Sequence, residues 1–364
     1  MTQRRLFTAL IALAITLTLA APAWADGPSA VAWLKTQQNA DGGFGSPSTI
    51  GATADAVLAV AAGGENALAW GAPGATALDF IKTHIDAVTK AGEFAKVVLA
   101  LTANGQNPRS ALGDDLIARL ESMLGADGRI GGDGDFVNEH CMAVLALSSA
   151  NRAIPARAVN YLLAIQLAGG AWAWNADTTP GSGDNNTTAL AVVALIAAGV
   201  PADHAQIQKA IAHFKGQQNQ DGGFPYIKPS PWGDDSDSNS TAVVSWALLA
   251  AGEDPAGVDW KIFAQDGASA YDRLRAFQND SGAFRWQDAA PGDNFMSTVQ
   301  ALIALEMKTL PLARIDVGAP ATIPANAAPE TLPQTGGAPW PAALLLIAAG
   351  ATLIAAGRKL RRCA

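Results

Sequence analysis

Residues 37–44 read QQNADGGF, and residues 217–224 read QQNQDGGF. The two copies stand 180 positions apart, and each lies between a helix-like segment and a later run rich in Ala, Val and Leu. Near-identity at that distance indicates internal repetition, because a repeated supersecondary unit reuses the same turn chemistry at the same place.

Six apolar runs recur along the chain at intervals of 41 to 54 residues. They are apolar on nearly every side, which predicts helices that are buried all round. Most of them end at a residue suited to a left-handed helix cap, such as Gly63, Asn151 or Gly252. The runs occupy residues 53–64, 93–105, 140–151, 187–199, 240–252 and 296–307.

A second, amphipathic segment precedes each apolar run and mixes charged residues with Leu, Phe and Trp at helical spacing. These segments occupy residues 30–38, 76–85, 115–124, 158–166, 210–218 and 270–278. The alternation predicts an all-α fold with an outer and an inner layer of helices. A linear solenoid would satisfy the pattern, but a closed ring buries the inner layer better.

The repeated phrase falls at the corner between an outer and an inner helix. Its general form is Gln-x-x-x-Gly-x-aromatic, in which the glycine supplies a tight turn and the glutamine can bond free backbone groups at a helix end. A degraded copy is Leu124, Gly128 and Ile130, and the second repeat has no copy. The four good copies are Gln38, Gly42 and Phe44; Gln166, Gly170 and Trp172; Gln218, Gly222 and Phe224; and Gln278, Gly282 and Phe284.

This corner resembles the glutamine–tryptophan motif of the squalene-cyclase and protein-prenyltransferase superfamily. The resemblance covers roughly residues 28–310 and implies an α/α toroid of six helix pairs, assigned here to residues 26–310. In that superfamily the corner is structural, and we expect the same role here.

The chemistries of that superfamily are not intact in this chain. The segments 184–189 and 237–242 resemble the Asp-x-Asp-Asp-Thr-Ala acid motif of its terpene cyclases, but they keep only the first Asp and the Thr-Ala. Asn, Ser or Thr replaces the other carboxylates, and a hydroxyl cannot protonate an alkene. We therefore assign no catalytic residue and lean against an enzyme.

The zinc triad of its protein prenyltransferases is approached only by Glu139-His140-Cys141. Consecutive helical residues point about 100° apart, so at most one or two of these could share an ion. Cys141 also aligns with Ala189 and Ala242, which are predicted core positions. We assign no metal site to this cluster and expect no cofactor.

Because the inner helices run in one direction, the loops that enter them should gather at one end of the toroid, its mouth. Acids and aromatics concentrate there, which suits a glycan, a corrinoid-like or cationic ligand, or calcium. Cobalamin-binding proteins with a related toroid offer an analogy for the corrinoid. The candidate ligand-binding residues are Trp172, Trp174, Asp184, Tyr226, Trp232, Asp234, Asp235, Asp237, Trp286 and Asp293.

Two simpler interpretations of the mouth stay open. Asp184, Asn186, Asp237 and Asn239 could serve as helix N-caps, a role that short polar residues favour. Residues 235–239 begin like a calcium loop but lack its glycine and closing glutamate, which leaves only a looser calcium site.

The N-terminal end is typical of a secretory signal peptide over residues 1–25. Two arginines, Arg4 and Arg5, precede an apolar stretch, and Ala23 and Ala25 form a small-x-small cleavage site. The paired arginines also faintly resemble a twin-arginine export signal.

The C-terminal end resembles a cell-wall sorting signal of the LPxTG type, formed by Leu332, Pro333, Gln334, Thr335 and Gly336. An apolar stretch at 338–357 is long enough to span a bilayer, and the basic tail 358–364 would stay in the cytoplasm. A Pro- and Ala-rich stalk is predicted for 311–331. The resemblance implies sortase and the cell wall as partners, and a plain membrane anchor is the alternative.

Without its two ends the chain carries a formal charge of −14, which excludes a nucleic-acid partner. The sequence thus predicts an exported, surface-anchored toroid that binds a glycan or corrinoid-like ligand without catalysis. One alternative is a polysaccharide lyase or hydrolase that uses Asp235 and Asp237. The other alternative is a surface spacer or adhesin.

Overall fold

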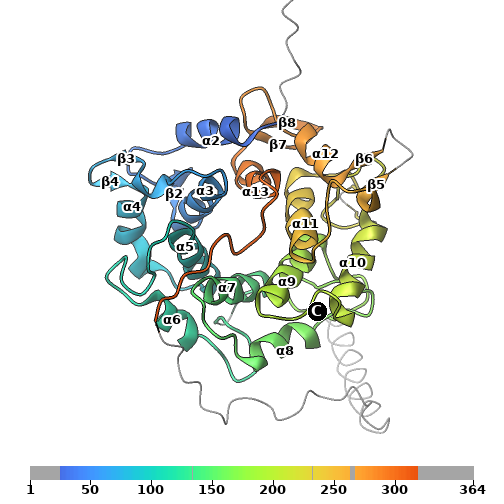
Figure 1. Ribbon diagram of the computed structural model, residues 1–364, viewed down its shortest axis with the longest axis horizontal. Helices are drawn as coiled ribbons and strands as arrows, with labels where there is room; N and C mark the ends of the chain where they lie inside the picture. Colours follow the sequence, from blue (N-terminus) through green and yellow to red (C-terminus); the bar gives the residue numbers. More distant parts are fainter. Residues whose placement is uncertain (1–24, 133, 232, 263–266, 319–364) are drawn as a thin grey trace, which may run out of the picture. The chain divides into compact units, whose positions relative to one another are not determined.

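The computed structural model describes residues 25–132, 134–231, 233–262 and 267–318. Six α-helices form the inner layer of a ring (Figure 1). Each contacts the next in sequence order, and the last contacts the first, so the ring is closed. These helices are α3 (Ile50–Ala62), α5 (Ala91–Ala103), α7 (Val137–Ser149), α9 (Asn185–Ala197), α11 (Ser238–Ala250) and α13 (Phe295–Leu305).

An outer layer of helices alternates with them along the chain and lies outside the ring (Figure 1). It comprises α2 (Gly27–Thr36), α4 (Ala77–His84), α6 (Leu116–Ser122), α8 (Ala156–Ala164), α10 (Ala205–Gln217) and α12 (Ala270–Ala276). The predicted helical toroid is therefore confirmed. The inner helices begin one to three residues earlier than predicted, because their N-caps lie upstream of the apolar runs.

In the described part of the chain, four small antiparallel hairpins lie between helices, and they were not predicted. They are β1 (Phe44–Gly45) with β2 (Ser48–Thr49), β3 (Gly71–Ala72) with β4 (Ala75–Thr76), β5 (Lys261–Ile262) with β6 (Ala268–Ser269), and β7 (Phe284–Gln287) with β8 (Ala290–Asn294). Three short 3₁₀ turns, η1 (Ala67–Ala69), η2 (Ile85–Ala87) and η3 (Val258–Trp260), also lie outside the helix pairs. The hairpins lie between the helices and leave the two helical layers unbroken.

The corner motif joins neighbouring repeats. Gln218 Nε2 donates to the carbonyl of Gly222 in its own turn and to the carbonyl of Trp260 in the next repeat, both at 2.9 Å. Gln278 donates in the same way to Gly282 and to Asp26, the N-cap of α2, and so links the last repeat to the first. Each of these glutamines therefore holds its own turn together and also links its repeat to the next one, and Gln278 links the last repeat to the first.

The corner glycine is required by both its conformation and its surroundings. Gly222 has φ +87°, and a Cβ there would lie 2.5 Å from the carbonyl oxygen of Ser269, at the start of the next outer helix. Any side chain would thus force the two repeats apart. The corner aromatics Phe44, Trp172, Phe224 and Phe284 are fully buried.

Two other corner glycines, Gly42 and Gly170, have the same geometry, with φ +86° and φ +92°. The carbonyl of each accepts from the side chain of its own corner glutamine at 2.9 Å. A Cβ at Gly42 would lie 2.4 Å from the carbonyl oxygen of Thr76, and one at Gly170 would lie 2.3 Å from that of Lys209. Each glycine thus lies against the next outer helix. Neither Gly42 nor Gly170 lines the cavities described below, so both belong to the corner and not to a binding site.

The segment after α13 crosses the end of the ring where the inner helices finish. Thr309 donates to the carbonyl of Trp246, Lys308 to that of Ala62, and the amide of Ile315 to that of Ser149. Because these carbonyls belong to α11, α3 and α7, the inner helices all end on this side. The predicted boundary at residue 310 therefore lies too early, since the toroid continues at least to the buried Val317.

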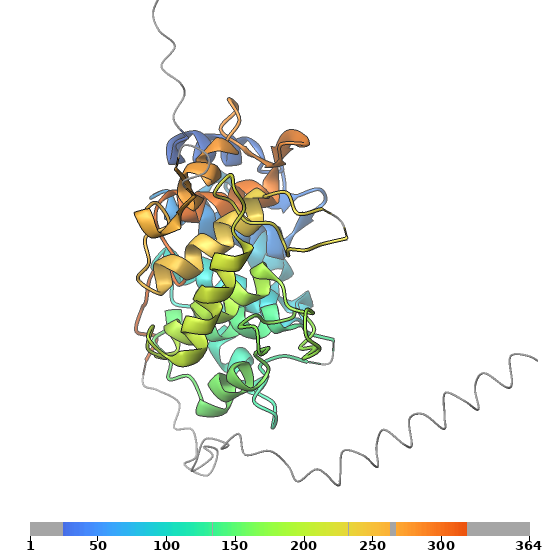
Figure 2. The ribbon, with the colours of Figure 1, turned by 90° about the vertical axis from the view of Figure 1, so that its right-hand side faces the viewer.

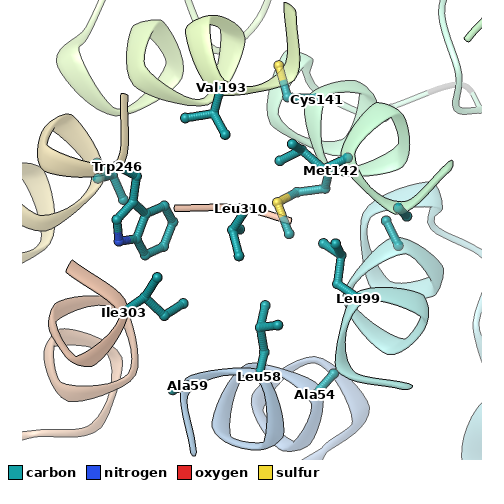
Figure 3. Close-up of a cluster of buried hydrophobic side chains, with 14 of the residues drawn as sticks. Ala54, Leu58, Ala59, Leu99, Cys141, Met142, Val193, Trp246, Ile303 and Leu310 are labelled. Atoms are coloured by element: carbon teal, nitrogen blue, oxygen red, sulfur yellow. The ribbon is translucent and has the colours of Figure 1, made fainter. Parts of the chain in front are cut away.

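Leu310 of this segment projects into the centre of the ring (Figure 3). Side chains from successive inner helices surround it, and it is 3% exposed. Six that face it in Figure 3 are Leu58, Leu99, Met142, Val193, Trp246 and Ile303. Leu310 thus closes one end of the ring and leaves the mouth at the other end.

Candidate binding site at the mouth

The mouth is the end of the ring at which the inner helices begin. The loops that precede α9 and α11 project from this side, on the right of Figure 2. Each of these two helices starts at an aspartate N-cap, Asp184 or Asp237, whose Oδ1 accepts from the amide three residues on at 2.7 Å. The N-cap interpretation is therefore confirmed for these two residues. It is wrong for Asn186 and Asn239, which lie inside the first turn.

A pocket of about 440 Å³ opens at the mouth over the first turns of α9, α11 and α13. Its volume falls within the range of about 300–1,000 Å³ that is usual for small-molecule sites. We call it the mouth pocket, and its lining is Asn186, Tyr226, Asp237, Asn239, Ser240, Trp286, Asn294, Met296 and Gln300.

Two aromatic rings stand at the edge of the mouth pocket. Tyr226 is 40% exposed and Trp286 is 45% exposed, so both offer apolar surface to a ligand. Between them lie amide side chains, of which Asn239 donates to Gln300 Oε1 at 2.7 Å and accepts from the hydroxyl of Ser297 at 3.1 Å. The pocket thus combines exposed aromatic surface with amides that can both donate and accept hydrogen bonds.

The electrostatics of the pocket are set by two buried carboxyl groups. Burial raises the pKa of Asp237 to about 6, although the amide and hydroxyl of Ser240 bond its carboxylate and oppose the shift. Burial likewise raises the pKa of Asp184, whose carboxylate interacts with Tyr226. Burial, with Asp184 nearby, raises the pKa of the Tyr226 hydroxyl, which therefore stays protonated.

Below the mouth pocket lies a central cavity of about 360 Å³ that the six inner helices surround. Gln300 lines both spaces and marks the neck between them. One wall is charged: Lys96 Nζ lies 2.7 Å from Asp55 Oδ2, with Glu93 and Glu139 beside it. The opposite wall is apolar and includes Leu190, Val243 and Trp246.

Of the ten predicted ligand-binding residues, the structure brings Tyr226, Asp237 and Trp286 together in the mouth pocket. Asp184 lies directly behind Tyr226. Trp174 is 42% exposed and packs edge-to-face on Phe136, with the ring centroids 4.6 Å apart.

The remaining predicted residues do not line the pocket. Trp172 is fully buried, and its Nε1 donates to the carbonyl of Leu162 at 2.7 Å, so it serves the corner. Asp293 accepts from Trp33 of the outer layer, and Asp234 accepts from the amide of Ser230 in its own loop. Asp235 is exposed, and Trp232 lies outside the described residues.

Sequence reasoning missed the part of the pocket that α13 contributes. Asn294 is the N-cap of α13, Met296 is 42% exposed, and Gln300 reaches the neck. One signal was available: Met296 and Gln300 follow Asn294 by two and six positions, as Asn186 and Leu190 follow Asp184.

The Glu139-His140-Cys141 cluster has structural roles. The amide of Ile130 donates to His140 Nδ1 at 2.9 Å, and His140 Nε2 lies 3.1 Å from the carbonyl of Ala158, so both ring nitrogens are bonded. In the four complete corners a threonine hydroxyl accepts from the amide of the corner aromatic, for example Thr241 at Phe224, and in the degraded corner at Ile130 His140 takes that place. Cys141 is fully buried.

Among the described residues, no group of three His, Cys, Asp or Glu side chains could hold a metal ion. The same part of the chain has no helix long and apolar enough to cross a membrane. The predicted signal peptide, sorting signal and apolar span all lie outside it.

Comparison with known proteins agrees with this architecture. Residues 133–290 match the squalene-hopene cyclase C-terminal domain family. The type II terpene cyclase MstE from Scytonema has a similar structure, with a TM-score of 0.54 at 18% identity over 77% of this chain and 96% of that one. No curated protein sequence matches the chain.

Two further solved structures are more distant. The ent-copalyl diphosphate synthase from Streptomyces platensis has a TM-score of 0.48 at 20% identity, over 71% of this chain and 50% of that one. Haptocorrin in complex with Cbi has a TM-score of 0.46 at 15% identity, over 80% of this chain and 68% of that one. The family match and the MstE fold support the resemblance to the terpenoid cyclase and prenyltransferase superfamily, and the chain has a terpene-cyclase-like helical fold.

Proposed function

We propose that this protein binds a glycan in the mouth pocket without chemically changing it. The observation that carries the proposal is that the exposed rings of Tyr226 and Trp286 border one pocket filled with amide and hydroxyl side chains. A sugar ring has an apolar face that packs on an aromatic ring, and hydroxyl groups at its edge that bond amides. The pocket therefore offers a partner for both features of a sugar ring.

The charge of the protein narrows the glycan class. The exported body is strongly acidic, and the mouth pocket contains Asp237 but no basic side chain among its lining residues. An anionic sugar would meet repulsion there without a cation to offset it. The preferred ligand is therefore an uncharged or amine-bearing glycan.

The hydrolase alternative fits the pocket less well. A glycosidase needs two carboxyl groups that flank the bond to be cleaved, and Asp237 is the one carboxylate among the residues lining the pocket. Both of its oxygens already bond Ser240. We propose that the carboxylates of Asp184 and Asp237 cap the starts of α9 and α11. We also propose that no metal or organic cofactor takes part in ligand binding.

We also propose that the toroid is displayed at the cell surface. The signal-like residues 1–25 support export, and the LPxTG-like residues 332–336 with the apolar stretch 338–357 support attachment by sortase to the wall, or retention in the membrane. Thr335→Ala separates these two fates, since it should move the protein from the wall fraction to the membrane fraction. Release of both proteins into the medium would overturn the anchoring proposal.

Binding is tested by titration calorimetry of the purified protein against uncharged, amine-bearing and anionic oligosaccharides, with a corrinoid as a further probe. We expect an uncharged or amine-bearing glycan to bind and to be recovered intact. Trp286→Ala and Asn239→Ala should each weaken binding at least tenfold, while Trp70→Ala, at the end of η1 and outside the lining of the mouth pocket, should bind normally. Circular dichroism checks that each variant is folded.

Three outcomes would overturn the proposal. They are no binding of any glycan, cleavage of the bound glycan, and binding of the corrinoid alone.

A further inference from the structure

Three exposed aromatic residues stand at the same sequence distance from the corner aromatic in consecutive repeats. Trp174, Tyr226 and Trp286 each follow the buried corner aromatic of their repeat by two residues. Their exposed fractions are similar, at 42%, 40% and 45%. The equivalent positions in the first and third repeats are Ser46 and Gly132, so this sequence position carries an aromatic residue only in the last three repeats.

The backbone fixes at least two of these rings relative to the inner helices. The carbonyl of Trp174 accepts from the amide of Val137, the first residue of α7, at 2.9 Å. The carbonyl of Tyr226 accepts in the same way from Asn185, the first residue of α9, also at 2.9 Å. Each aromatic therefore sits where the loop of its own repeat meets the inner helix of the preceding repeat.

Trp286 is held by different contacts. It lies in the strand β7, where Arg285 pairs with Asp293 of the strand β8. Strand β7 contacts α11 and α13. The three residues therefore lie beside α7, beside α9, and in a strand beside α11 and α13, helices that follow one another around the ring (Figure 1). We call Trp174, Tyr226 and Trp286 the aromatic arc.

We propose that the aromatic arc binds an extended polysaccharide chain that runs along this half of the mouth, so that its sugars stack on successive rings. This proposal rests on the proposed function, glycan binding, and specifies that the ligand is a polysaccharide chain and not a single sugar. Packed helices lie about 8–10 Å apart, which exceeds the length of one sugar ring. In the proposed complex, neighbouring aromatics contact different sugars of the chain, and the mouth pocket that Tyr226 and Trp286 line binds one sugar.

The charge along the arc restricts the chain to uncharged or amine-bearing sugars. Within 173–183 the charged residue is Asp177, and within 225–236 the exposed acids Asp234 and Asp235 accompany a single base, Lys228. The amine of Lys228 is already bonded to the carbonyl of Gln218 and to Asn219. In the third loop, Arg285 stands beside Trp286 and pairs with Asp288 at 2.8 Å. An anionic chain would therefore meet only bases that are already bonded along the three loops.

The arc predicts a strong dependence of affinity on chain length. A short oligosaccharide reaches the mouth pocket alone, whereas a longer one engages further rings at high effective concentration, which can add a factor of about 10²–10⁴. Trp174 lies at the end of the arc, one repeat away from the mouth pocket. Trp174→Ala should thus affect long chains and spare short ones.

The test is a calorimetric titration of the purified protein with β-1,4-linked N-acetylglucosamine oligomers of increasing length, and with their deacetylated, amine-bearing forms. We expect at least one of the two series to gain tenfold or more in affinity from the dimer to the longest soluble oligomer. Trp174→Ala should remove most of this gain and leave dimer binding within twofold. Trp70→Ala is the matched control and should change neither.

Failure of the arc is distinguishable from failure of the mouth pocket. If dimers and long chains bind equally, or if Trp174→Ala weakens both alike, the arc is overturned while glycan binding stands. If neither series binds at any length and other uncharged glycans also fail, the arc and the proposed function both fall.

Discussion

Replacing Gln218 with glutamate tests the corner without changing side-chain volume. Gln218 is buried, and its Nε2 donates to two carbonyl oxygens at 2.9 Å, those of Gly222 and Trp260. Each such hydrogen bond contributes about 0.5–1.5 kcal/mol, and each buried carbonyl left without a donor costs about 1–3 kcal/mol. At neutral pH a glutamate would place a carboxylate oxygen against both carbonyls. Two such carbonyls give a total of about 2–6 kcal/mol, which we expect as the loss in the free energy of unfolding of Gln218→Glu.

The assay is urea unfolding followed by far-UV circular dichroism. Gln208→Glu on the exposed face of α10 is the control with the same change of charge, and it should cost less than about 1 kcal/mol, as surface substitutions usually do. Burial against two carbonyls should raise the pKa of the new carboxyl above its unfolded value of about 4.3. The difference from wild type should consequently be smallest below that pH and grow as the pH rises. A loss at neutral pH no larger than that of the control would refute the role given to the corner glutamine.

Three further predictions concern buried groups. Asp237→Asn keeps a good N-cap but removes a carboxyl whose pKa is raised to about 6. The stability of this variant relative to wild type should therefore improve as the pH rises from about 4 to 6, measured by urea unfolding. A difference in stability that does not change with pH would contradict this. Burial lowers the pKa of His140 to about 4, so wild type should lose stability as the pH falls from about 6.5 to 4. His140→Thr should lose less stability over this range, measured by thermal melts. Equal losses would contradict the role of a buried, neutral His140. Leu310→Ala should cost about 2–5 kcal/mol in urea unfolding, as for other buried leucines, and more than Leu312→Ala; equal costs would show that Leu310 does not fill the ring.

The toroid was predictable because its signals are local. Each corner carries its own glutamine, turn glycine and aromatic, and each inner run is apolar by itself, so no long-range contact had to be known. The segment after α13 was assigned wrongly to the stalk because only its local composition could be read from the sequence. Its proline and alanine content predicts a stalk, whereas the contacts of Leu310 and Val317 depend on the closed ring.

The lining of the mouth pocket was only partly predictable. Asp237, Tyr226 and Trp286 were found because acids and aromatics cluster in the loops that enter the inner helices. Gln300 was missed because it lies on a helix, and only the angle of α13 in the ring turns it toward the pocket. Trp172 was predicted both as a corner aromatic and as a ligand-binding residue. Its hydrogen bond to the carbonyl of Leu162 shows that it belongs to the corner.

Amide hydrogen exchange with and without a saturating glycan tests most directly whether the mouth is the binding face. The account predicts that slowing of exchange is concentrated in 173–186, 225–240 and 284–296, with the segment 308–317 at the opposite end of the ring unchanged. Protection confined to the outer helices or to 308–317 would contradict it.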